Sequence, residues 1–288
     1  MHIVYDKIRE IYASEVAAYG GVKSEALLRA YAAVPRERML PQGPWTVEAL
    51  DGSYYVTDDA DASRILHAVG VSIDPKRQLN SGNPAEVGRM LEEAHIEPGE
   101  TAFHVGAGLG YFSAIMAELV GESGRVIAAE IDPVLAWRCR GNLAPWPQVE
   151  VVGDGLACSL PPVDVIFASA GTASIPASWL EALRPGGRMI LPLTGSLNGG
   201  FIFRVEKGVS PVWLSAKPLN FVRFYPCFGA REPAAVAAVD QAIADPRGSH
   251  VRSLRLDVHA RQPECWLHSD GWCLSTAAHD HSDRMESL

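Results

Sequence analysis

The sequence predicts an α/β fold in which helices cover a doubly wound, mostly parallel sheet. Between residues 83 and 193, short apolar segments alternate with segments of helical periodicity, which is the pattern of parallel strands joined by helical crossovers. A glycine-rich segment, residues 106–110, follows one of the apolar segments and precedes a helical one. Such a turn lies at the carboxyl edge of the sheet, where open α/β folds bind their ligands.

The core strands are predicted from short runs of apolar residues. We place them at residues 101–105, 125–130, 149–152, 163–168 and 187–193. The helices between them are expected to begin near Ala85, Tyr111, Pro133 and Ser178. Each helix then returns the chain to the same edge of the sheet, as a parallel arrangement requires.

The N-terminal segment, residues 1–80, is predicted to be a helical extension followed by a loop. Apolar residues recur at helical spacing in the first forty residues, where Ser24 is placed to cap a second helix and Pro35 to end it. From residue 41 to residue 75, Gly, Pro and Asp interrupt short apolar segments, which predicts mostly loop. We therefore expect the core to begin near residue 81.

The C-terminal segment, residues 196–288, is predicted to extend or cap the core at residues 81–195. We expect a helix at 232–244 and strands at 201–205, 212–214 and 251–258. A hairpin is expected around the Asp-Gly turn at residues 270–271, with Trp266 and Trp272 packing it rather than binding a ligand.

Metal binding is not expected from the sequence. The C-terminal residues His279, Asp280, His281 and Asp283 resemble a metal cluster only by composition. The five cysteines fall at irregular spacings without a C-x-x-C motif, which favours a reducing cytoplasm over a disulfide framework.

Composition limits the partners that the chain is expected to have. Hydrophobic residues make up 48% and charged residues 20% of the sequence, which is ordinary for a globular protein. The formal net charge of -9 argues against nucleic-acid binding, because phosphate contacts need clustered Lys and Arg. No secretory signal pattern and no membrane-spanning apolar run is found. A peptide or small-molecule partner fits better, and a homodimer is left open.

The chemistry centres on the glycine-rich segment between Val105 and Tyr111. Glycines are needed where a backbone turns tightly and a ligand approaches without interference from a Cβ atom. The spacing is G-x-G-x-G, from Gly106 through Gly108 to Gly110. A dinucleotide site favours G-x-G-x-x-G, and Tyr111 stands in the place of its last glycine. A nicotinamide-dependent oxidoreductase is therefore the weaker alternative.

Two acidic residues follow the next two predicted strands. Glu130 ends the second strand, where a carboxylate is placed to accept hydrogen bonds from two ribose hydroxyls. Asp154 lies between Gly153 and Gly155 after the third strand, where it is placed to accept from an adenine amino group. Their order at consecutive strand ends indicates a cofactor containing a nucleoside.

Four sequence segments resemble the protein-L-isoaspartate O-methyltransferases. They are VPRE at 34–37, VGAGLGYFSAIMAELVG at 105–121, GDG at 153–155 and LRPGGRMILPL at 183–193. The resemblance, which runs from about residue 25 to 195, implies a Rossmann-like fold and an enzyme that methylates a carboxylate with S-adenosyl-L-methionine. It also implies cofactor-binding roles for Gly106, Gly108, Gly110, Glu130 and Asp154, to which we add the neighbours Ala107, Ile131 and Gly155.

Two positions depart from the family pattern. The family places a Ser-x-Pro motif before the helix that precedes the glycine loop, whereas this chain has Gly82 in the place of the serine. Ser81 and Asn83 are therefore the candidates for the missing catalytic hydrogen bond. His104 stands where the family has an acidic residue near the methionine part of the cofactor, so it joins the expected cofactor site without the role of a base.

Methyl transfer to a carboxylate depends mainly on positioning. The acceptor is already ionised near pH 7, so the enzyme must hold it in line with the bond that breaks. Besides Ser81 and Asn83, candidate donors lie in the loop at residues 169–172, after the fourth strand.

Two alternatives within the same fold stay open. One is a methyltransferase for the carboxylate of another peptide or of a small molecule, which the Gly82 departure and the C-terminal addition favour. The other is a module that binds S-adenosylmethionine without isoaspartyl repair activity.

Overall fold

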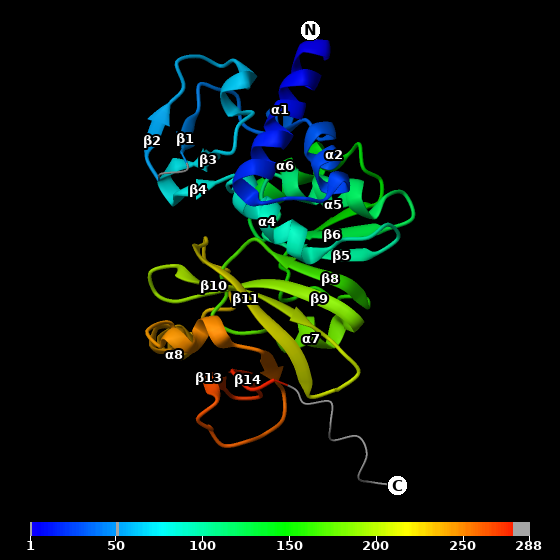
Figure 1. The fold of residues 1–288 in the computed structure, drawn as a ribbon. Helices are drawn as coiled ribbons and strands as arrows, with labels where there is room; N and C mark the ends of the chain where they lie inside the picture. Colours follow the sequence, from blue (N-terminus) through cyan, green and yellow to red (C-terminus); the bar gives the residue numbers. More distant parts are fainter. Residues whose placement is uncertain (1, 50–51, 279–288) are drawn as a thin grey trace. The chain divides into compact units, whose positions relative to one another are not determined.

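The computed structural model of the chain describes residues 2–49 and 52–278. The chain divides into two compact units, Met1–Cys158 and Ser159–Leu288. Each unit has its own arrangement of helices and strands (Figure 1), and each is described by itself below.

The first unit begins with three helices, α1 (His2–Gly20), α2 (Glu25–Ala33) and α3 (Arg36–Met39). The Ser24 side chain caps α2 by accepting a hydrogen bond from the backbone N–H of Leu27 at 3.3 Å. This confirms the predicted helical N-terminus and its cap. The short helix α3 was not predicted, because one turn leaves no periodicity in a sequence.

A small antiparallel sheet follows, with the strand order β2-β1-β3-β4. Its strands are β1 (Thr46–Glu48), β2 (Tyr54–Val56), β3 (Gly70–Asp74) and β4 (Leu79–Asn80), with short 3-10 helices η1 (Ala62–Ile65) and η2 (Pro75–Arg77). The prediction of mostly loop missed this sheet, because strands of two to five residues show no reliable alternation. Its buried residues Val47 and Val71 share a hydrophobic cluster with Leu109 and Leu135, so the small sheet packs beside the glycine loop.

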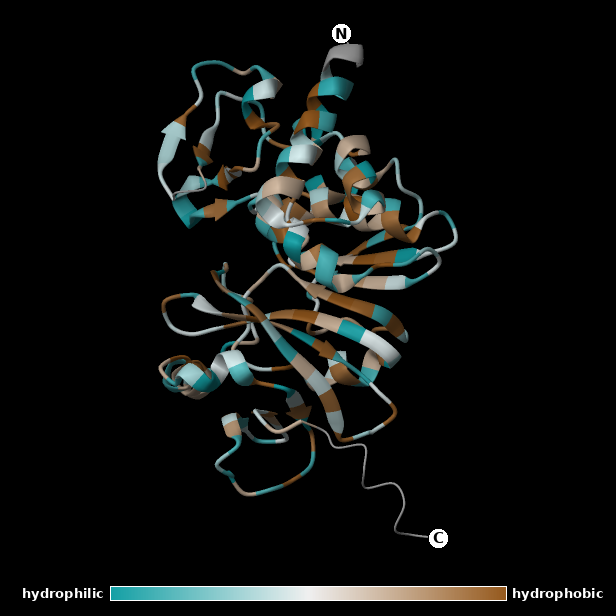
Figure 2. Cartoon of the chain, in the orientation of Figure 1, coloured by the Kyte–Doolittle hydropathy of each residue, from teal (hydrophilic) through white to brown (hydrophobic). Residues whose placement is uncertain are grey.

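The parallel part of the first unit matches the prediction closely. After α4 (Pro84–Ala94), the chain forms β5 (Thr101–Val105), α5 (Tyr111–Val120), β6 (Arg125–Ala129), α6 (Pro133–Leu143) and β7 (Val149–Val152). Strand β6 pairs in parallel with β5 on one side and β7 on the other. Figure 2 shows the apolar character of β5 and β6, whose inner residues are buried. The carboxyl ends of the three strands therefore lie along one edge.

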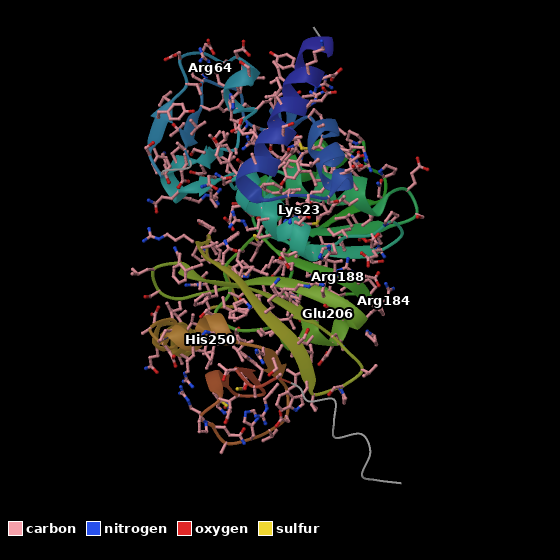
Figure 3. The ribbon with its side chains drawn as sticks, viewed as in Figure 1. Lys23, Arg64, Arg184, Arg188, Glu206 and His250 are labelled. Atoms are coloured by element: carbon pink, nitrogen blue, oxygen red, sulfur yellow. The ribbon has the colours of Figure 1, made fainter. Side chains whose placement is uncertain are left out.

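The second unit combines one parallel pair with a series of antiparallel strands. Strands β8 (Val163–Ala168) and β9 (Leu183–Thr194) are parallel and are joined through α7 (Ala177–Ala182). Antiparallel pairing then continues through β10 (Gly199–Glu206), β11 (Trp213–Arg223), β12 (Ser253–Arg255), β14 (Trp272–Ser275) and β13 (Cys265–Ser269). The register places Glu206 of β10 opposite Arg188 of β9 (Figure 3). Helix α8 (Pro233–Ile243) and 3-10 helix η3 (Pro246–His250) separate β11 from β12.

These elements confirm the predicted α/β class and most of the predicted C-terminal elements. The helix and the Asp-Gly hairpin form where expected. Strand β11 is much longer than the predicted 212–214, and β12 is shorter than the predicted 251–258. The division into segments 1–80, 81–195 and 196–288 stays a prediction. Within the described residues, no helix has both the length and the apolar composition needed to cross a membrane.

Candidate cofactor and substrate site

The glycine loop connects β5 to α5 with three residues in the left-handed region. Gly106, Gly108 and Gly110 have φ values of +78°, +57° and +92°, which side chains rarely tolerate. At Gly110 an added Cβ would lie 2.9 Å from Leu143 Cγ, whereas at Gly108 it would meet nothing within 4 Å. Gly110 is therefore required by packing, while Gly108 leaves open space beside the loop.

Glu130 follows β6 and ties this loop to the start of α6. Its Oε2 accepts from the backbone N–H of Gly108 at 2.7 Å, and its Oε1 accepts from the N–H of Asp132 at 2.9 Å. The residue is 7% exposed. Burial raises the pKa of the Glu130 carboxyl, against the lowering effect of the two amide hydrogen bonds. Because a carboxylate offers about four lone-pair sites, it can accept further hydrogen bonds from a ligand.

The loop after β7 carries Asp154 in an exposed turn. Asp154 Oδ1 accepts from the backbone N–H of Leu156 at 2.8 Å. A Cβ at Gly155 would lie 3.0 Å from Ala129 Cβ, whereas a Cβ at Gly153 would meet nothing within 4 Å. Beside Glu130, the apolar side chain of Ile131 is 50% exposed. The three strand ends thus offer a carboxylate, an exposed apolar side chain and open glycine positions, which fit a nucleoside cofactor.

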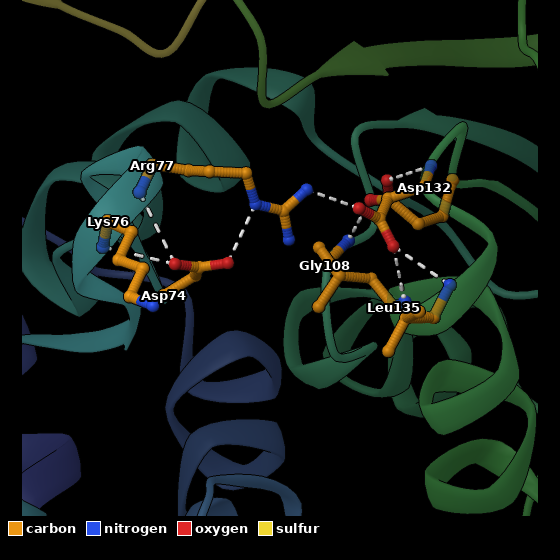
Figure 4. Close-up of polar contacts among 8 residues, drawn as sticks. Asp74, Lys76, Arg77, Gly108, Asp132 and Leu135 are labelled. Atoms are coloured by element: carbon orange, nitrogen blue, oxygen red, sulfur yellow. Dashed lines mark hydrogen bonds and ion pairs between the residues drawn. The ribbon is translucent and has the colours of Figure 1, made fainter.

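An ion-pair network, which the sequence analysis did not find, supports this edge. Arg77 donates through Nε to Asp74 at 2.7 Å and also pairs with Asp132 (Figure 4). Asp132 caps α6 by accepting from the backbone N–H groups of Val134 and Leu135. The network fixes the 3-10 helix η2 to the beginning of α6, next to Glu130.

The loop before α4 holds the two predicted catalytic residues. Ser81 Oγ accepts from Arg36 Nη2 at 3.1 Å and from the N–H of Val71 at 3.0 Å. Asn83 caps α4 through Oδ1, while its Nδ2 donates to the carbonyl of Ala68 at 3.0 Å. Both side chains therefore have structural partners, and their catalytic role stays a prediction.

Gly82, in the place of the family serine, is confined by its surroundings. Its φ is +74°, and an added Cβ would lie 3.0 Å from Phe112 Cε2 in the first turn of α5. The loop thus lies against the helix that the glycine loop opens. A serine at this position would need a different backbone conformation.

Arg36, in the VPRE segment, supports the loop before α4 through hydrogen bonds. It is 1% exposed and donates to the carbonyls of Ile65, His67 and Val69 as well as to Ser81. In the sequence, this arginine contributes to the family resemblance, and no role is predicted for it. The signal that could have indicated a role for Arg36 was its position directly after Pro35 in a segment that resembles the family.

His104, near the end of β5, lies inside the unit. Its side chain is fully buried, and Nδ1 lies 2.7 Å from Ser113 Oγ. Burial lowers the pKa of His104 to about 3, so the ring is neutral at physiological pH. This arrangement favours a structural role for the imidazole, and a cofactor contact stays a prediction.

The remaining predicted positions follow residue 158 and belong to the second unit. In the loop at 169–172, Gly171 N–H donates to the carbonyl of Tyr225 at 2.8 Å, and Thr172 is fully buried. Thr172 therefore serves packing of its own unit. The composition-based cluster His279, Asp280, His281 and Asp283 lies outside the described residues.

Comparison with known protein families identifies the family of this chain. The family model described as protein-L-isoaspartate(D-aspartate) O-methyltransferase matches residues 10–231. The chain belongs to this family. Membership confirms the resemblance seen in the sequence, and with it the predicted S-adenosylmethionine-dependent O-methyltransferase class and the predicted cofactor.

Individual relatives extend over most of the chain. It is 34% identical over 210 residues to a protein-L-isoaspartate O-methyltransferase from Methanopyrus kandleri, covering 71% of this chain and 84% of that protein. It is 32% identical over 228 residues to protein-L-isoaspartate O-methyltransferase 1 from an Anaeromyxobacter species, covering 75% and 94%.

Two solved structures have the same fold. A protein-L-isoaspartate O-methyltransferase aligns with a TM-score of 0.65 and 25% identity, over 77% of this chain and 66% of its own. A putative family member from Plasmodium falciparum, solved with S-adenosyl-L-homocysteine, aligns with a TM-score of 0.59 at 14% identity, over 76% and 97%. The second likeness concerns the fold alone.

Proposed function

We propose that this chain transfers a methyl group from S-adenosylmethionine to an isoaspartyl carboxylate in a protein or peptide. The observation that carries the proposal is the buried Glu130 carboxylate, which two backbone amides hold beside a glycine loop with open space at Gly108. The names of the relatives from Methanopyrus and Anaeromyxobacter support isoaspartate as the acceptor.

The cofactor-binding residues are each suited to a different part of S-adenosylmethionine. S-adenosylmethionine supplies a methyl group that is bonded to a positively charged sulfur. When the methyl group is transferred, the sulfur leaves as a neutral thioether. Glu130 accepts hydrogen bonds from the ribose hydroxyls, for which it has lone pairs beyond those used by Gly108 and Asp132. Ile131 gives the purine an apolar surface, and Asp154 accepts from its amino group.

The acceptor side depends on the loop before α4. A carboxylate is ionised near neutral pH and needs no base, so this loop has only to hold it in place. Asn83 Nδ2 donates one hydrogen to Ala68, and its second hydrogen has no acceptor among the described residues. Asn83 is therefore the better candidate donor, because Ser81 Oγ already serves Arg36 and Val71.

A different carboxylate is the second candidate acceptor. The specific observation in its favour is Gly82. Its φ of +74° and the approach of an added Cβ to Phe112 exclude a serine at this position in the same backbone conformation. A chain without that serine is expected to hold its acceptor differently. The carboxylate of another peptide or of a small molecule, or cofactor binding without repair, would follow from this difference.

One experiment tests the proposal and separates these outcomes. Isothermal titration with S-adenosylmethionine is followed, in the same preparation, by methyl transfer to an isoaspartyl peptide and to its aspartyl control. Micromolar binding with transfer only to the isoaspartyl peptide is the expected result. Binding without transfer would redirect the search to other carboxylates, and the absence of binding would refute the proposal.

The remaining expectations concern the surroundings of the enzyme. A reducing cytoplasm stays the predicted location, and the five cysteines, all among the described residues, are free thiols. The absence of a nucleic-acid partner and the homodimer that we left open also stay predictions.

A further inference from the structure

Four potential metal ligands converge in the C-terminal part of the second unit. They are His259, Cys265, His268 and Cys273, and one ligand atom from each lies within 4.8 Å of all the others. Cys265 is 1% and Cys273 0% exposed, and the side chain of His259 is 8% exposed. All four lie beyond residue 231, where the family match ends, so nothing in the methyltransferase site requires them.

Strands β13 and β14 form a hairpin (Figure 1), and its register brings Cys265, His268 and Cys273 to one face. In a regular strand, residues three apart such as Cys265 and His268 point to opposite faces. Here the register shifts between Cys265 and Leu267, with Cys265 opposite Ser275 and His268 opposite Cys273. The extra residue returns His268 to the face of Cys265, because a bulge changes the alternation by one.

His259 is already oriented as a ligand. Its Nδ1 lies 2.8 Å from the backbone carbonyl of Asp257, to which it donates, and 3.2 Å from the Asp257 carboxylate. This hydrogen bond leaves Nε2 with its lone pair, 3.5 Å from Cys265 Sγ. Metal-binding histidines are commonly fixed in this way through the other ring nitrogen. Arg255 holds the Asp257 carboxylate in turn.

Two further groups point to a bound cation. The Nδ1 atom of His268 is buried and has no hydrogen-bond partner among the residues that the structure describes, which is costly unless a donor or metal satisfies it. The backbone N–H of Gln262 donates to Cys265 Sγ at 3.3 Å, a contact that supports a negatively charged thiolate. A packed hydrophobic cluster would explain neither feature.

We propose that His259, Cys265, His268 and Cys273 bind a zinc ion in a closed, structural site. Tetrahedral zinc with bonds of about 2.3 Å to sulfur and about 2.0–2.1 Å to nitrogen sets its ligand atoms roughly 3.3–3.8 Å apart. The His259–Cys265 distance already lies in this range, and the other pairs, all within 4.8 Å, need to close by about 1.5 Å or less on binding. Two thiolates with two imidazoles favour zinc over magnesium or calcium.

The ion would fasten the segment after β12 to the terminal hairpin. Residues 256–264 contain no helix or strand, and His259 is the ligand that this segment contributes. This proposal opposes the sequence-based expectation of no metal. It is independent of the proposed function, because no ligand belongs to the cofactor or acceptor residues.

The test begins with the metal content of the full chain, purified without a polyhistidine tag. Elemental mass spectrometry should find about one zinc per chain. This zinc should be released when the thiols are titrated with a mercurial reagent. After removal of zinc, Co²⁺ alone should give the visible absorption of a tetrahedral site together with a sulfur-to-cobalt charge-transfer band. These readouts need no variant and no enzymatic activity.

Variants assign the ligands. Cys265→Ser, Cys273→Ser and His268→Ala should each lose most of the zinc and the cobalt spectrum. The matched controls Cys227→Ser, which removes another buried cysteine, and His250→Ala, which removes an exposed histidine, should keep both. Binding of S-adenosylmethionine, measured in parallel, should remain in the ligand variants.

Three results would overturn the proposal. The first is a wild-type chain that contains no zinc and gives no tetrahedral cobalt spectrum. The second is full zinc stoichiometry in both the Cys265→Ser and the Cys273→Ser variant. The third is a disulfide between these two cysteines in protein purified without oxidant. Each is measured on the folded chain irrespective of methyl transfer.

Discussion

The carboxylate of Glu130 accepts a hydrogen bond from the backbone N–H of Gly108 at 2.7 Å. This contact joins the loop after β5 to the end of β6, two segments that the sequence separates by a whole helix. A second amide, from Asp132, holds the other oxygen. The cofactor site is therefore organised by the same carboxylate that is proposed to bind the ribose.

Replacing Glu130 with glutamine is expected to weaken cofactor binding. The substitution removes the negative charge and one acceptor oxygen, and hydrogen bonds to charged groups contribute about 1.5–3 kcal/mol. We expect the Kd for S-adenosylmethionine to rise about tenfold to hundredfold. Isothermal titration measures this change. Glu150→Gln, at an exposed position on β7, is the control, and an equal loss in both variants would contradict the role of Glu130.

Cofactor binding should also weaken as the pH falls. Burial raises the pKa of Glu130, so its carboxyl takes up a proton at a higher pH than an exposed one does. The protonated group accepts fewer hydrogen bonds from ribose hydroxyls. Titrations across the acidic range should show a Kd that increases with acidity in the wild type and changes less in Glu130→Gln. A pH-independent Kd in the wild type would argue against ribose binding at this residue.

His104 is expected to make the folded state sensitive to acid. Burial lowers its pKa from 6.5 to about 3, so between these values the unfolded chain binds the proton and the folded chain does not. The stability from neutral His104 is thus present above pH 6.5 and is lost as the pH falls, by at most about 1.4 kcal/mol per pH unit. Urea unfolding at several pH values should show a shallower dependence in His104→Asn. The exposed His250→Asn variant should retain the wild-type slope.

Gly82 is expected to resist substitution more than another glycine with positive φ. Gly21 has φ +69° and open space around an added Cβ, whereas at Gly82 the added atom meets Phe112 at 3.0 Å. Gly21→Ala should cost about 1–2 kcal/mol of unfolding free energy from backbone strain, and Gly82→Ala should cost more. Urea titration compares the two. Gly82→Ser should not increase transfer to an isoaspartyl peptide, and an increase would show that the loop accommodates the family serine.

Arg36 is expected to be irreplaceable by lysine. Its guanidinium donates to three backbone carbonyls and to Ser81, and a lysine ammonium cannot match this fork geometry. The loss of hydrogen bonds from a charged donor should lower the unfolding free energy by about 1.5–3 kcal/mol. Denaturant unfolding of Arg36→Lys tests this. The exposed Arg38→Lys should stay within about 0.5 kcal/mol of the wild type.

Short continuous apolar segments made the core strands predictable. The predicted strands at 101–105, 149–152 and 163–168 coincide with β5, β7 and β8. Most residues of β5 and β8 are buried, and parallel strands that are covered on both faces appear as continuous apolar runs. The small sheet of β1 to β4 was missed, because its strands of two to five residues show no reliable alternation. The length of β11 was missed for a different reason, because pairing with β10 rather than local propensity extends it.

The candidate site was predictable where local chemistry dictates it. Glycines at positive φ and an acid at a strand end leave a signal in the sequence, and Gly106, Gly108 and Glu130 occupy the places that this signal indicates. The partners of Ser81 and His104 left none. They depend on which side chains the fold brings within hydrogen-bond distance.

The sequence by itself determined the α/β class, the order of the core elements and the family, because these depend on periodicity and on short motifs. Only the tertiary structure decided that Arg36 supports Ser81, that Arg77 pairs with Asp132, and that His259 meets Cys265. Such contacts join residues through hairpins, bulges and packing. Spacing along the chain does not record them, and the zinc site proposed here was therefore invisible until the β13–β14 register was known.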